Sequence, residues 1–367
     1  MTTSPFRSIR RARPGWVAIL LLAVWLAPAV APAPAGAAPY AALVMDARTG
    51  QVLHARSADR RLHPASLTKM MTLYMAIEAV KQGRLGLDQR VRVSSAAAKQ
   101  PPSKIGLLAG QRVTVRHLMR AAAVKSANDA ATALAEATVG GSVRDWARAA
   151  NAKALALGMS STSFRNPHGL TQSGHLSTAR DMAVLSRRLF FDHPEYWSLF
   201  SRERTVAMGR TLRTTNRRFL GSYRGADGIK TGYTRAAGFN LAASAQRGDQ
   251  HVIAVMFGGR SSAQRTQQMA KLMDMGFARS PRVAARIRPG PVATQLARAP
   301  LPEQRPQAPD TLLGRVAKAV TPSAAASTRV STATRRAPRR SELPVSRPGK
   351  AVAESLTVAV EFPASRP

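Results

Sequence analysis

Strand-like segments at both ends of one globular region, Tyr40–Arg279, constrain the fold of this chain most. Near the start of the region, two short apolar runs flank the turn-forming segment 46–50, which predicts a hairpin. Near its end, the last two apolar runs are joined by a hairpin-type connection at 246–249. The expected strands are residues 41–45, 51–55, 228–233, 238–245 and 251–257.

A long helical block, roughly residues 66–200, separates these two β-rich ends. Apolar residues recur at helical spacing over 66–82, and an alanine-rich segment with few helix breakers covers 114–137. Strands at both ends with helices between them predict an α/β (α+β) fold: one antiparallel sheet covered by helices, plus a helical subdomain. The expected helices are residues 66–82, 114–137 (one or two helices), 144–157, 178–191 and 262–277.

The segment that precedes this region has the order of a secretory signal. Residues 1–37 begin with several arginines, continue with an apolar run from Trp16 to about Leu26, and end in small residues around Ala35-Gly36-Ala37. This order is typical of a cleavable signal peptide, and the apolar run is short for a membrane span. We therefore expect export, with an uncleaved membrane anchor as the alternative.

The segment that follows the region, residues 279–367, differs from it in composition. It holds 16 Lys and Arg against 5 Asp and Glu, and Phe362 is its only aromatic residue. Such a segment buries too little apolar area to offset its ordering entropy, so we expect a basic, disordered tail. The predicted domains are therefore a signal peptide at 1–37, a catalytic domain at 38–278 and the tail at 279–367.

The composition of the whole chain excludes several kinds of site. Its 367 residues include no cysteine, so disulfides, thiolate metal ligands and cysteine nucleophiles are excluded. The seven histidines lack the spacing of a zinc site and are interpreted as structural, so we expect no metal and no cofactor. A formal net charge of +36 favours polyanions, and export favours anionic wall polymers or lipids over nucleic acid.

Ser66-Leu67-Thr68-Lys69 is the first segment that can carry chemistry. Residues three apart on a helix share a face, so Lys69 can reach the Ser66 hydroxyl. A lysine kept neutral by burial and nearby positive charge could act as the general base that makes Ser66 a nucleophile. Because Ser-x-x-Lys is common by chance, this spacing alone is weak evidence.

Two further segments follow along the chain. In Ser126-Ala127-Asn128, the hydroxyl could relay a proton and the amide could orient Lys69 or hold a substrate carbonyl. In Lys230-Thr231-Gly232, on an expected edge strand, the lysine supplies positive charge for an anionic substrate terminus and the glycine lets a substrate backbone approach. Taken singly, a helix cap and a strand end explain these segments equally well.

Together and in this order, the three segments match the motif set of penicillin-binding proteins and class A β-lactamases. With the framing segments 64–72, 166–170 and 227–234, residues 38–278 resemble the low-molecular-mass D-alanyl-D-alanine carboxypeptidases of peptidase family S11. The resemblance implies a β-lactamase/transpeptidase-like fold. It also implies a periplasmic or cell-envelope serine peptidase that removes the terminal D-alanine from peptidoglycan stem peptides and is acylated by β-lactams.

The same resemblance implies a role for each site residue. Ser66 would attack the penultimate D-alanine carbonyl, with Lys69 as general base and with Ser126 and Asn128 completing the proton network. The backbone N–H groups of Ser66 and Tyr233 would form the oxyanion hole. The implied substrate-binding residues are Lys230, Thr231, Gly232, Tyr233 and, from the Asn216-Arg217 pair before the third motif, Arg217.

Several alternatives remain open. A β-lactamase needs fast deacylation, and because no glutamate occurs between Ala137 and Glu195, slowly deacylating adducts on Ser66 are expected instead. A DD-endopeptidase or transpeptidase differs only in the bond cut or in the acyl acceptor. The three intact motifs argue against a non-catalytic wall-binding protein. The basic tail is expected either to contact anionic membrane or wall, or to be a solvated linker.

Overall fold

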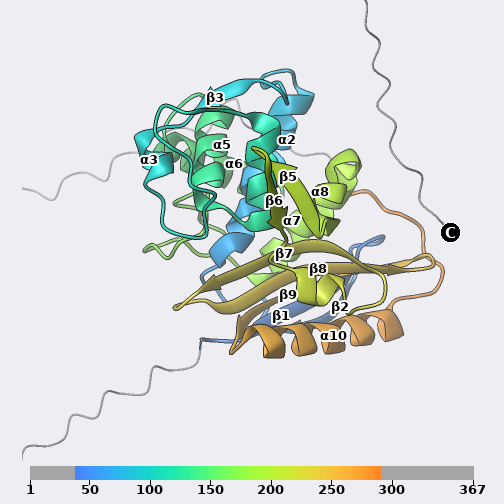
Figure 1. Cartoon of the computed structure of the whole chain (residues 1–367). Helices are drawn as coiled ribbons and strands as arrows, with labels where there is room; N and C mark the ends of the chain where they lie inside the picture. The colour runs from blue at the N-terminus through green and yellow to red at the C-terminus, as the bar shows by residue number, and fades with distance from the viewer. Residues whose placement is uncertain (1–37, 291–367) are drawn as a thin grey trace, which may run out of the picture. The chain divides into compact units, whose positions relative to one another are not determined.

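A five-stranded antiparallel sheet with the order β2-β1-β9-β8-β7 joins the two β-rich ends of the chain (Figure 1). The computed structural model describes residues 38–290, so the predicted signal segment 1–37 and residues 291–367 of the predicted tail lie outside the described residues. The sheet confirms the expected strands and both expected hairpins. Its strands are β1 (Ala41–Asp46), β2 (Val52–Arg56), β7 (Ala226–Thr234), β8 (Gly238–Arg247) and β9 (Gln250–Gly259).

Alternation of side chains along the strands gives the sheet two apolar faces. Along β1, Leu43 and Met45 belong to the larger cluster of buried residues, whereas Ala42 and Val44 belong to a second cluster. The central strand β9 is buried along nearly its whole length. A sheet that is apolar on both faces requires helices on both.

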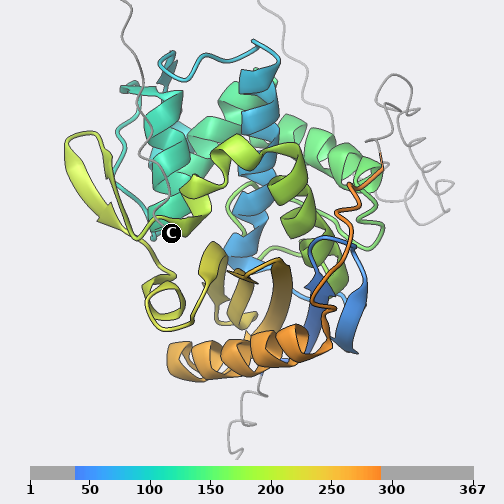
Figure 2. The same cartoon turned by 90° about the vertical axis from the view of Figure 1, so that its right-hand side faces the viewer.

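Helices cover the two faces unequally (Figures 1 and 2). One amphipathic helix, α10 (Ser262–Arg279), packs Met269, Leu272 and Met273 into the second cluster. On the other face, α7 (Ala179–Asp192) contacts β1 and β9. The buried helix α2 (Lys69–Lys81) runs from the sheet into the helical subdomain (Figure 2), so residues at its start lie between the two parts of the fold.

Two of the expected helices are interrupted. The segment 66–82 begins as the 3-10 helix η1 (Ala65–Thr68) before continuing as α2. The segment 114–137 contains a π-helical turn, η2 (Ala121–Lys125), and breaks at Ser126, whose φ of 61° lies in the left-handed region. Both interruptions fall at residues that the sequence marks as candidates for chemistry.

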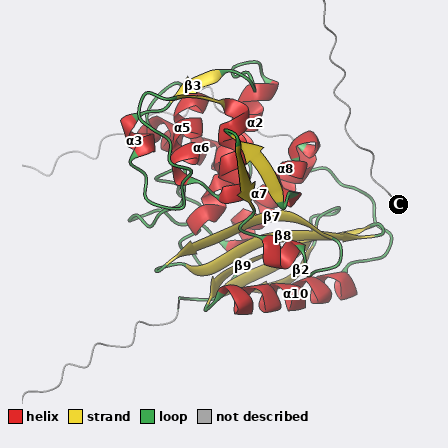
Figure 3. Cartoon of the chain, viewed as in Figure 1, coloured by secondary structure: helices red, strands yellow, loops and turns green. Residues whose placement is uncertain are grey.

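The remaining elements form the helical subdomain and short connections (Figure 3). The expected helices 144–157 and 178–191 are confirmed as α6 and α7. Two small two-stranded sheets, β3-β4 and β5-β6, and four short helices are additional to the expected elements. The elements not yet given are β3 (Arg90–Arg92), α3 (Ser95–Ala98), β4 (Arg112–Thr114), α4 (Val115–Arg120), α5 (Asn128–Val139), α6 (Val143–Ala156), η3 (Pro194–Tyr196), α8 (Ser198–Ser201), β5 (Arg204–Ala207), β6 (Arg210–Arg213) and α9 (Arg217–Leu220).

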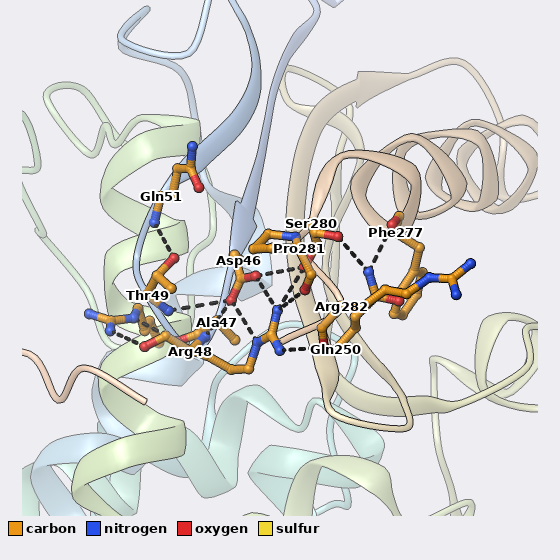
Figure 4. A network of polar contacts seen from close by, with 11 residues as sticks. Asp46, Ala47, Arg48, Thr49, Gln51, Gln250, Phe277, Ser280, Pro281 and Arg282 are labelled. Atoms are coloured by element: carbon orange, nitrogen blue, oxygen red, sulfur yellow. Dashed lines mark hydrogen bonds and ion pairs between the residues drawn. The ribbon is translucent and has the colours of Figure 1, made fainter. Parts of the chain in front are cut away.

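After α10, the chain is bound back to the β1–β2 turn by a buried polar network (Figure 4). Arg48 donates to Asp46 Oδ2 at 2.8 Å and to the carbonyl oxygen of Pro281 at 2.6 Å. Ser280 also donates to Asp46 Oδ2 at 2.6 Å. Further on, the Ile287 N–H donates to the Arg48 carbonyl oxygen at 2.9 Å. The segment 280–290 is thus part of the described fold. No helix within residues 38–290 has the length and apolar character needed to cross a membrane.

Candidate active site

The Ser66 hydroxyl and the Lys69 amine meet where η1 passes into α2. Lys69 Nζ lies 3.0 Å from Ser66 Oγ. Ser66 lines an open cleft, whereas Lys69 is fully buried. The candidate nucleophile therefore faces solvent-accessible space, while its candidate base is kept away from water.

Hydrogen bonds account for each proton of a neutral Lys69 amine. Nζ lies 2.7 Å from Asn128 Oδ1 and 2.7 Å from the His168 carbonyl oxygen, and both atoms can only accept. The Asn128 amide is oriented by its Nδ2, which donates to the Pro101 carbonyl oxygen at 2.8 Å. A neutral amine that donates to both acceptors has its lone pair left for its third neighbour, the Ser66 hydroxyl.

The surroundings of Lys69 favour this neutral form. Burial lowers the pKa of Lys69 well below its ordinary value, and the Lys230 ammonium lowers it further, against an opposing effect of the Asp129 carboxylate. Burial also lowers the pKa of Lys230 to about 7, with Arg265 contributing in the same direction. Lys69 is therefore suited to accept the proton of Ser66.

Ser126 brings the second and third motifs together. It lines the cleft from the left-handed break before α5. Lys230 Nζ donates to Ser126 Oγ at 2.8 Å and to the Thr231 carbonyl oxygen at 3.0 Å. The hydroxyl of Ser126 is thereby placed next to a buried amine, where it can pass a proton onward.

Strand β7 passes Ser66 at contact distance. A Cβ atom on Gly232 would lie 3.0 Å from the Pro64 carbonyl oxygen and 3.1 Å from Ser66 N. Glycine permits this approach, and the next residue, Tyr233, also lines the cleft. The backbone N–H groups of Ser66 and Tyr233 are the candidate donors to an oxyanion here.

The cleft has a volume of about 330 Å³ and a cationic end. Arg265 of α10 is 5% exposed, and within the described residues its Nε has no hydrogen-bond partner. The hydroxyls of Thr215 and Thr231 lie 2.6 Å apart in the same cleft. This end can hold a carboxylate. Of the predicted site residues, Ser66, Ser126, Asn128, Thr231, Gly232 and Tyr233 line the cleft, and Lys69 and Lys230 are buried behind them.

Arg217 is not brought into the cleft. It begins α9 with an exposed side chain and is absent from the lining residues, whereas its neighbour Asn216 is buried. Arg265 is the cationic residue at the cleft that the motif analysis missed. Its signal in the sequence is its position: it lies on the buried stripe of α10 that continues with Met269 and Leu272, where a charge is unexpected.

A loop over residues 166–172 supports η1 from the other side. A Cβ atom on Gly169, whose φ is +89°, would lie 1.8 Å from the Ala65 carbonyl oxygen, so loop and helix are in direct contact. His175 Nδ1 accepts from the Arg165 N–H at 2.9 Å, which leaves Nε2 to donate to Thr68 Oγ1 at 2.9 Å. Burial lowers the pKa of His175 to about 4, in agreement with the neutral ring that this pattern requires.

Comparison with known sequences identifies relatives of the same kind. The profile of the peptidase S11 family, described as D-alanyl-D-alanine carboxypeptidase, matches residues 29–261. A curated relative, the D-alanyl-D-alanine carboxypeptidase DacF of Bacillus subtilis, is 37% identical over 245 residues. This match covers 64% of the present chain and 61% of DacF, so the chain spans less than two thirds of that relative's length.

Solved structures show the same likeness. Penicillin-binding protein 6B from Escherichia coli is 38% identical with a TM-score of 0.61, covering 66% of this chain and 77% of that one. Penicillin-binding protein D2 from Listeria monocytogenes, in its ampicillin-bound form, is 34% identical with a TM-score of 0.57. This match covers 65% of the present chain and 96% of that one. With three motifs gathered around one cleft and with these matches in sequence and structure, the chain belongs to the peptidase S11 family of D-alanyl-D-alanine carboxypeptidases.

Proposed function

We propose that this chain is a serine-type D-Ala-D-Ala carboxypeptidase that removes the terminal D-alanine from peptidoglycan stem peptides. One observation carries the proposal. Two acceptors, Asn128 Oδ1 and the His168 carbonyl oxygen, take the protons of a neutral Lys69 amine, so that its lone pair faces Ser66. A serine in this position is an activated nucleophile.

Acylation and deacylation both use this pair. Ser66 Oγ bonds to the penultimate D-alanine carbonyl carbon while its proton passes to Lys69 Nζ, and the N–H groups of Ser66 and Tyr233 stabilise the oxyanion. The peptide bond then breaks, and the proton moves from Lys69, directly or through the Ser126 hydroxyl, to the departing D-alanine amine. A water molecule next attacks the ester, gives its proton to Lys69 and releases the peptide acid as Ser66 regains its hydrogen.

The cationic end of the cleft selects a substrate with a free carboxylate. Arg265 offers a free donor, and Thr215 and Thr231 offer hydroxyls beside the buried Lys230. A terminal carboxylate held there places the bond one residue before it opposite Ser66. We assign this role to Arg265 in place of Arg217.

Two other reactions of the same superfamily are less well supported. Fast β-lactam hydrolysis needs a base for deacylation, and no carboxylate is among the residues that line the cleft. Asp145 caps α6 and Asp181 binds Ser161 and Thr162, so neither is available there. An endopeptidase expels a leaving group larger than D-alanine, whereas the cationic end favours a small anionic one.

Incubation with purified muropeptides, followed by chromatography, tests the proposal. We expect free D-alanine and shortened stem peptides from the wild-type protein and none from Ser66→Ala. Cleaved cross-links without free D-alanine would instead assign an endopeptidase, and new cross-links formed with release of D-alanine, in place of shortened stem peptides, would assign a transpeptidase. Slow loss of a bound penicillin would agree with the proposal, whereas rapid turnover would assign a β-lactamase.

We also propose that the protein acts in the cell envelope and that its basic tail contacts an anionic membrane. The support is the signal-like segment 1–37 and the excess of basic residues over 279–367. Co-sedimentation with anionic vesicles should occur at low salt and fall at high salt for the chain that lacks 1–37. The same protein ending at Gly290 should sediment less. Equal sedimentation of both would assign the tail as a solvated linker.

A further inference from the structure

A second cavity, of about 650 Å³, adjoins the catalytic cleft on the far side of the 166–172 loop. Leu170 lines both cavities. The neighbouring residue Thr171 donates to Thr234 Oγ1 at 3.0 Å, and Thr234 lines the catalytic cleft. The loop is therefore a shared wall, over which a long substrate could extend from one cavity to the other.

The direction of β7 shows which part of a substrate would reach this second cavity. Lys230 and Thr231 lie at the cationic end, Gly232 lies beside Ser66 N with no room for a Cβ atom between them, and Thr234 contacts the loop two residues further along. If the free carboxylate lies beside Lys230 and Thr231 and the scissile bond lies beside Gly232, the substrate residues upstream of that bond extend toward Leu170. The second cavity is thus on the acyl side of the substrate.

Arginines give this second cavity a positive lining. Arg144, Arg148 and Arg165 line it, and no Asp or Glu does. Arg148 is paired with Asp145, whereas Arg144 and Arg165 have no ion pair within residues 38–290. Burial, followed by the nearby Lys69, lowers the pKa of the lining residue His168 to about 3, so the positive charge comes from the arginines.

The position of Arg144 is unfavourable for the helix that carries it. It lies in the first turn of α6, directly after the N-cap Ser142 and Val143. A helix N-terminus carries partial positive charge, so a cation there is repelled and an anion beside it is attracted. The Asp145 carboxylate already caps this helix end, so it is the two unpaired arginines that favour an anionic ligand.

We propose that this pocket is an acyl-side subsite that binds a carboxylate carried by the substrate upstream of the scissile bond. The inference rests on the proposed carboxypeptidase function and adds a substrate class to it: stem peptides with a free carboxylate before the residue that forms the acyl-enzyme. Arg144 and Arg165 are its principal ligands, and both are exposed enough to move toward a bound peptide. The pocket thus determines specificity and takes no part in the bond-making step.

Three synthetic peptides test the proposal, all ending in Nε-acetyl-lysyl-D-alanyl-D-alanine. In the short peptide the lysine Nα carries only an acetyl group. In the other two, a glutamate or a glutamine precedes the lysine. For the wild-type protein we expect kcat/KM for the glutamate peptide to exceed that for the glutamine peptide by about three- to tenfold at low salt, as for one or two partly exposed ion pairs. The difference should shrink with added sodium chloride.

Charge-removal variants locate the effect. The double variant Arg144→Gln/Arg165→Gln should bring the glutamate-to-glutamine ratio close to one and leave kcat/KM for the short peptide unchanged. Arg112→Gln on β4, which lines neither cavity, should keep the wild-type ratio. A ratio near one in the wild type, or a wild-type ratio in the double variant, rejects the subsite. If no peptide releases D-alanine, the proposed function is rejected and the subsite with it.

Discussion

Single hydrogen bonds decide the chemistry at the residue scale. Lys69 can act as a base only if its amine is neutral and its lone pair is directed at the Ser66 hydroxyl. The two carbonyl-type acceptors around Nζ and the oriented Asn128 amide provide that arrangement. The predictions at this scale concern these few atoms.

Replacing Lys69 should greatly slow acylation while leaving the fold intact. Lys69→Met removes a buried amine that burial already disfavours in its charged form, so the unfolding midpoint should not fall greatly. The rate of acylation by a penicillin should drop about 10²- to 10⁴-fold, as for the loss of a general base. Stopped-flow or gel-based labelling measures this rate. Lys271→Met, at an exposed position of α10, is the matched control and should label at the wild-type rate.

The pH dependence of acylation should follow the proton on Lys69. Because the amine must be neutral to accept a proton, the rate should fall as the pH falls below its lowered pKa. In Asn128→Asp, a carboxylate faces the amine and favours the ammonium, which raises that pKa. The acidic limb of the rate profile should therefore move to higher pH in the variant. An unmoved limb would show that another group controls it.

At the element scale, the site depends on helices that break where the chemistry lies. Ser126 occupies a left-handed position between η2 and α5, and Ser66 lies in the 3-10 helix η1 before α2. Contacts between loops then hold these breaks in place. Of these, the Asp129 carboxylate accepts the N–H groups of Ile105, Gly106 and Leu107 at 2.9–3.2 Å, fixing the loop whose residues Pro102 and Ser103 line the cleft.

Asp129→Ala should loosen that wall of the cleft. Asp129 is completely buried, and its removal leaves four backbone N–H groups, those of the three loop residues and of Ala130, without their acceptor. We expect a loss of about 1–3 kcal/mol in the free energy of unfolding, measured by denaturant titration. Asp88→Ala, which removes an exposed ion pair with Arg116, should unfold close to the wild-type midpoint. Equal midpoints for both variants would contradict the role given to Asp129.

Two glycines with nearly the same positive φ separate the effect of backbone strain from that of steric contact. Gly169 and Gly158 have φ values of +89° and +88°. A Cβ atom at Gly169 would collide with the Ala65 carbonyl oxygen, whereas at Gly158 nothing lies within 4 Å. Both alanine variants should lose about 1–2 kcal/mol to the left-handed backbone. Only Gly169→Ala should also slow penicillin acylation, because only it displaces η1; equal acylation rates would contradict this.

The sequence predicted the elements that periodicity and length make visible, and it missed those that tertiary contacts select. The five strands and long helices have strong apolar patterns. The hairpin of β5 and β6 is short and rich in arginine, so no apolar alternation marks it. The break at Ser126 and the cleft position of Arg265 depend on packing between distant segments, which local patterns do not report.

At the scale of the whole molecule, a buried polar network joins the two ends of the described region. The network of Asp46, Arg48 and Ser280 ties the first hairpin to the segment after α10 (Figure 4). Burial favours the neutral acid, but hydrogen bonds from Arg48 and Ser280 lower the pKa of Asp46 overall. The stability that the ion pair of Asp46 and Arg48 adds is fully present above the unfolded-state pKa of aspartate. It is lost as the pH falls through the lowered pKa of Asp46 in the folded protein.

Breaking this network should lower the free energy of unfolding substantially. Arg48 and Asp46 are 2% and 0% exposed, so Arg48→Met leaves a buried carboxylate without its main partner. We expect a loss of about 3–5 kcal/mol in the free energy of unfolding at neutral pH. The double variant Arg48→Met/Asp46→Leu should lose less stability than the single variant.

Truncation tests the same network from the other end. A chain ending at Gly290 should have the unfolding midpoint of one ending at Pro367, whereas a chain ending at Arg279 should unfold at a lower denaturant concentration.

The most direct test of the account is to locate the acyl group by mass spectrometry. After brief exposure to penicillin, the protein should gain the mass of one penicillin, and proteolysis should place that mass on the peptide containing Ser66. Ser66→Ala should carry no adduct, although its unfolding midpoint is unchanged. An adduct on Ser126 or any other residue, or one that persists in Ser66→Ala, would contradict the assignment of Ser66 as the nucleophile.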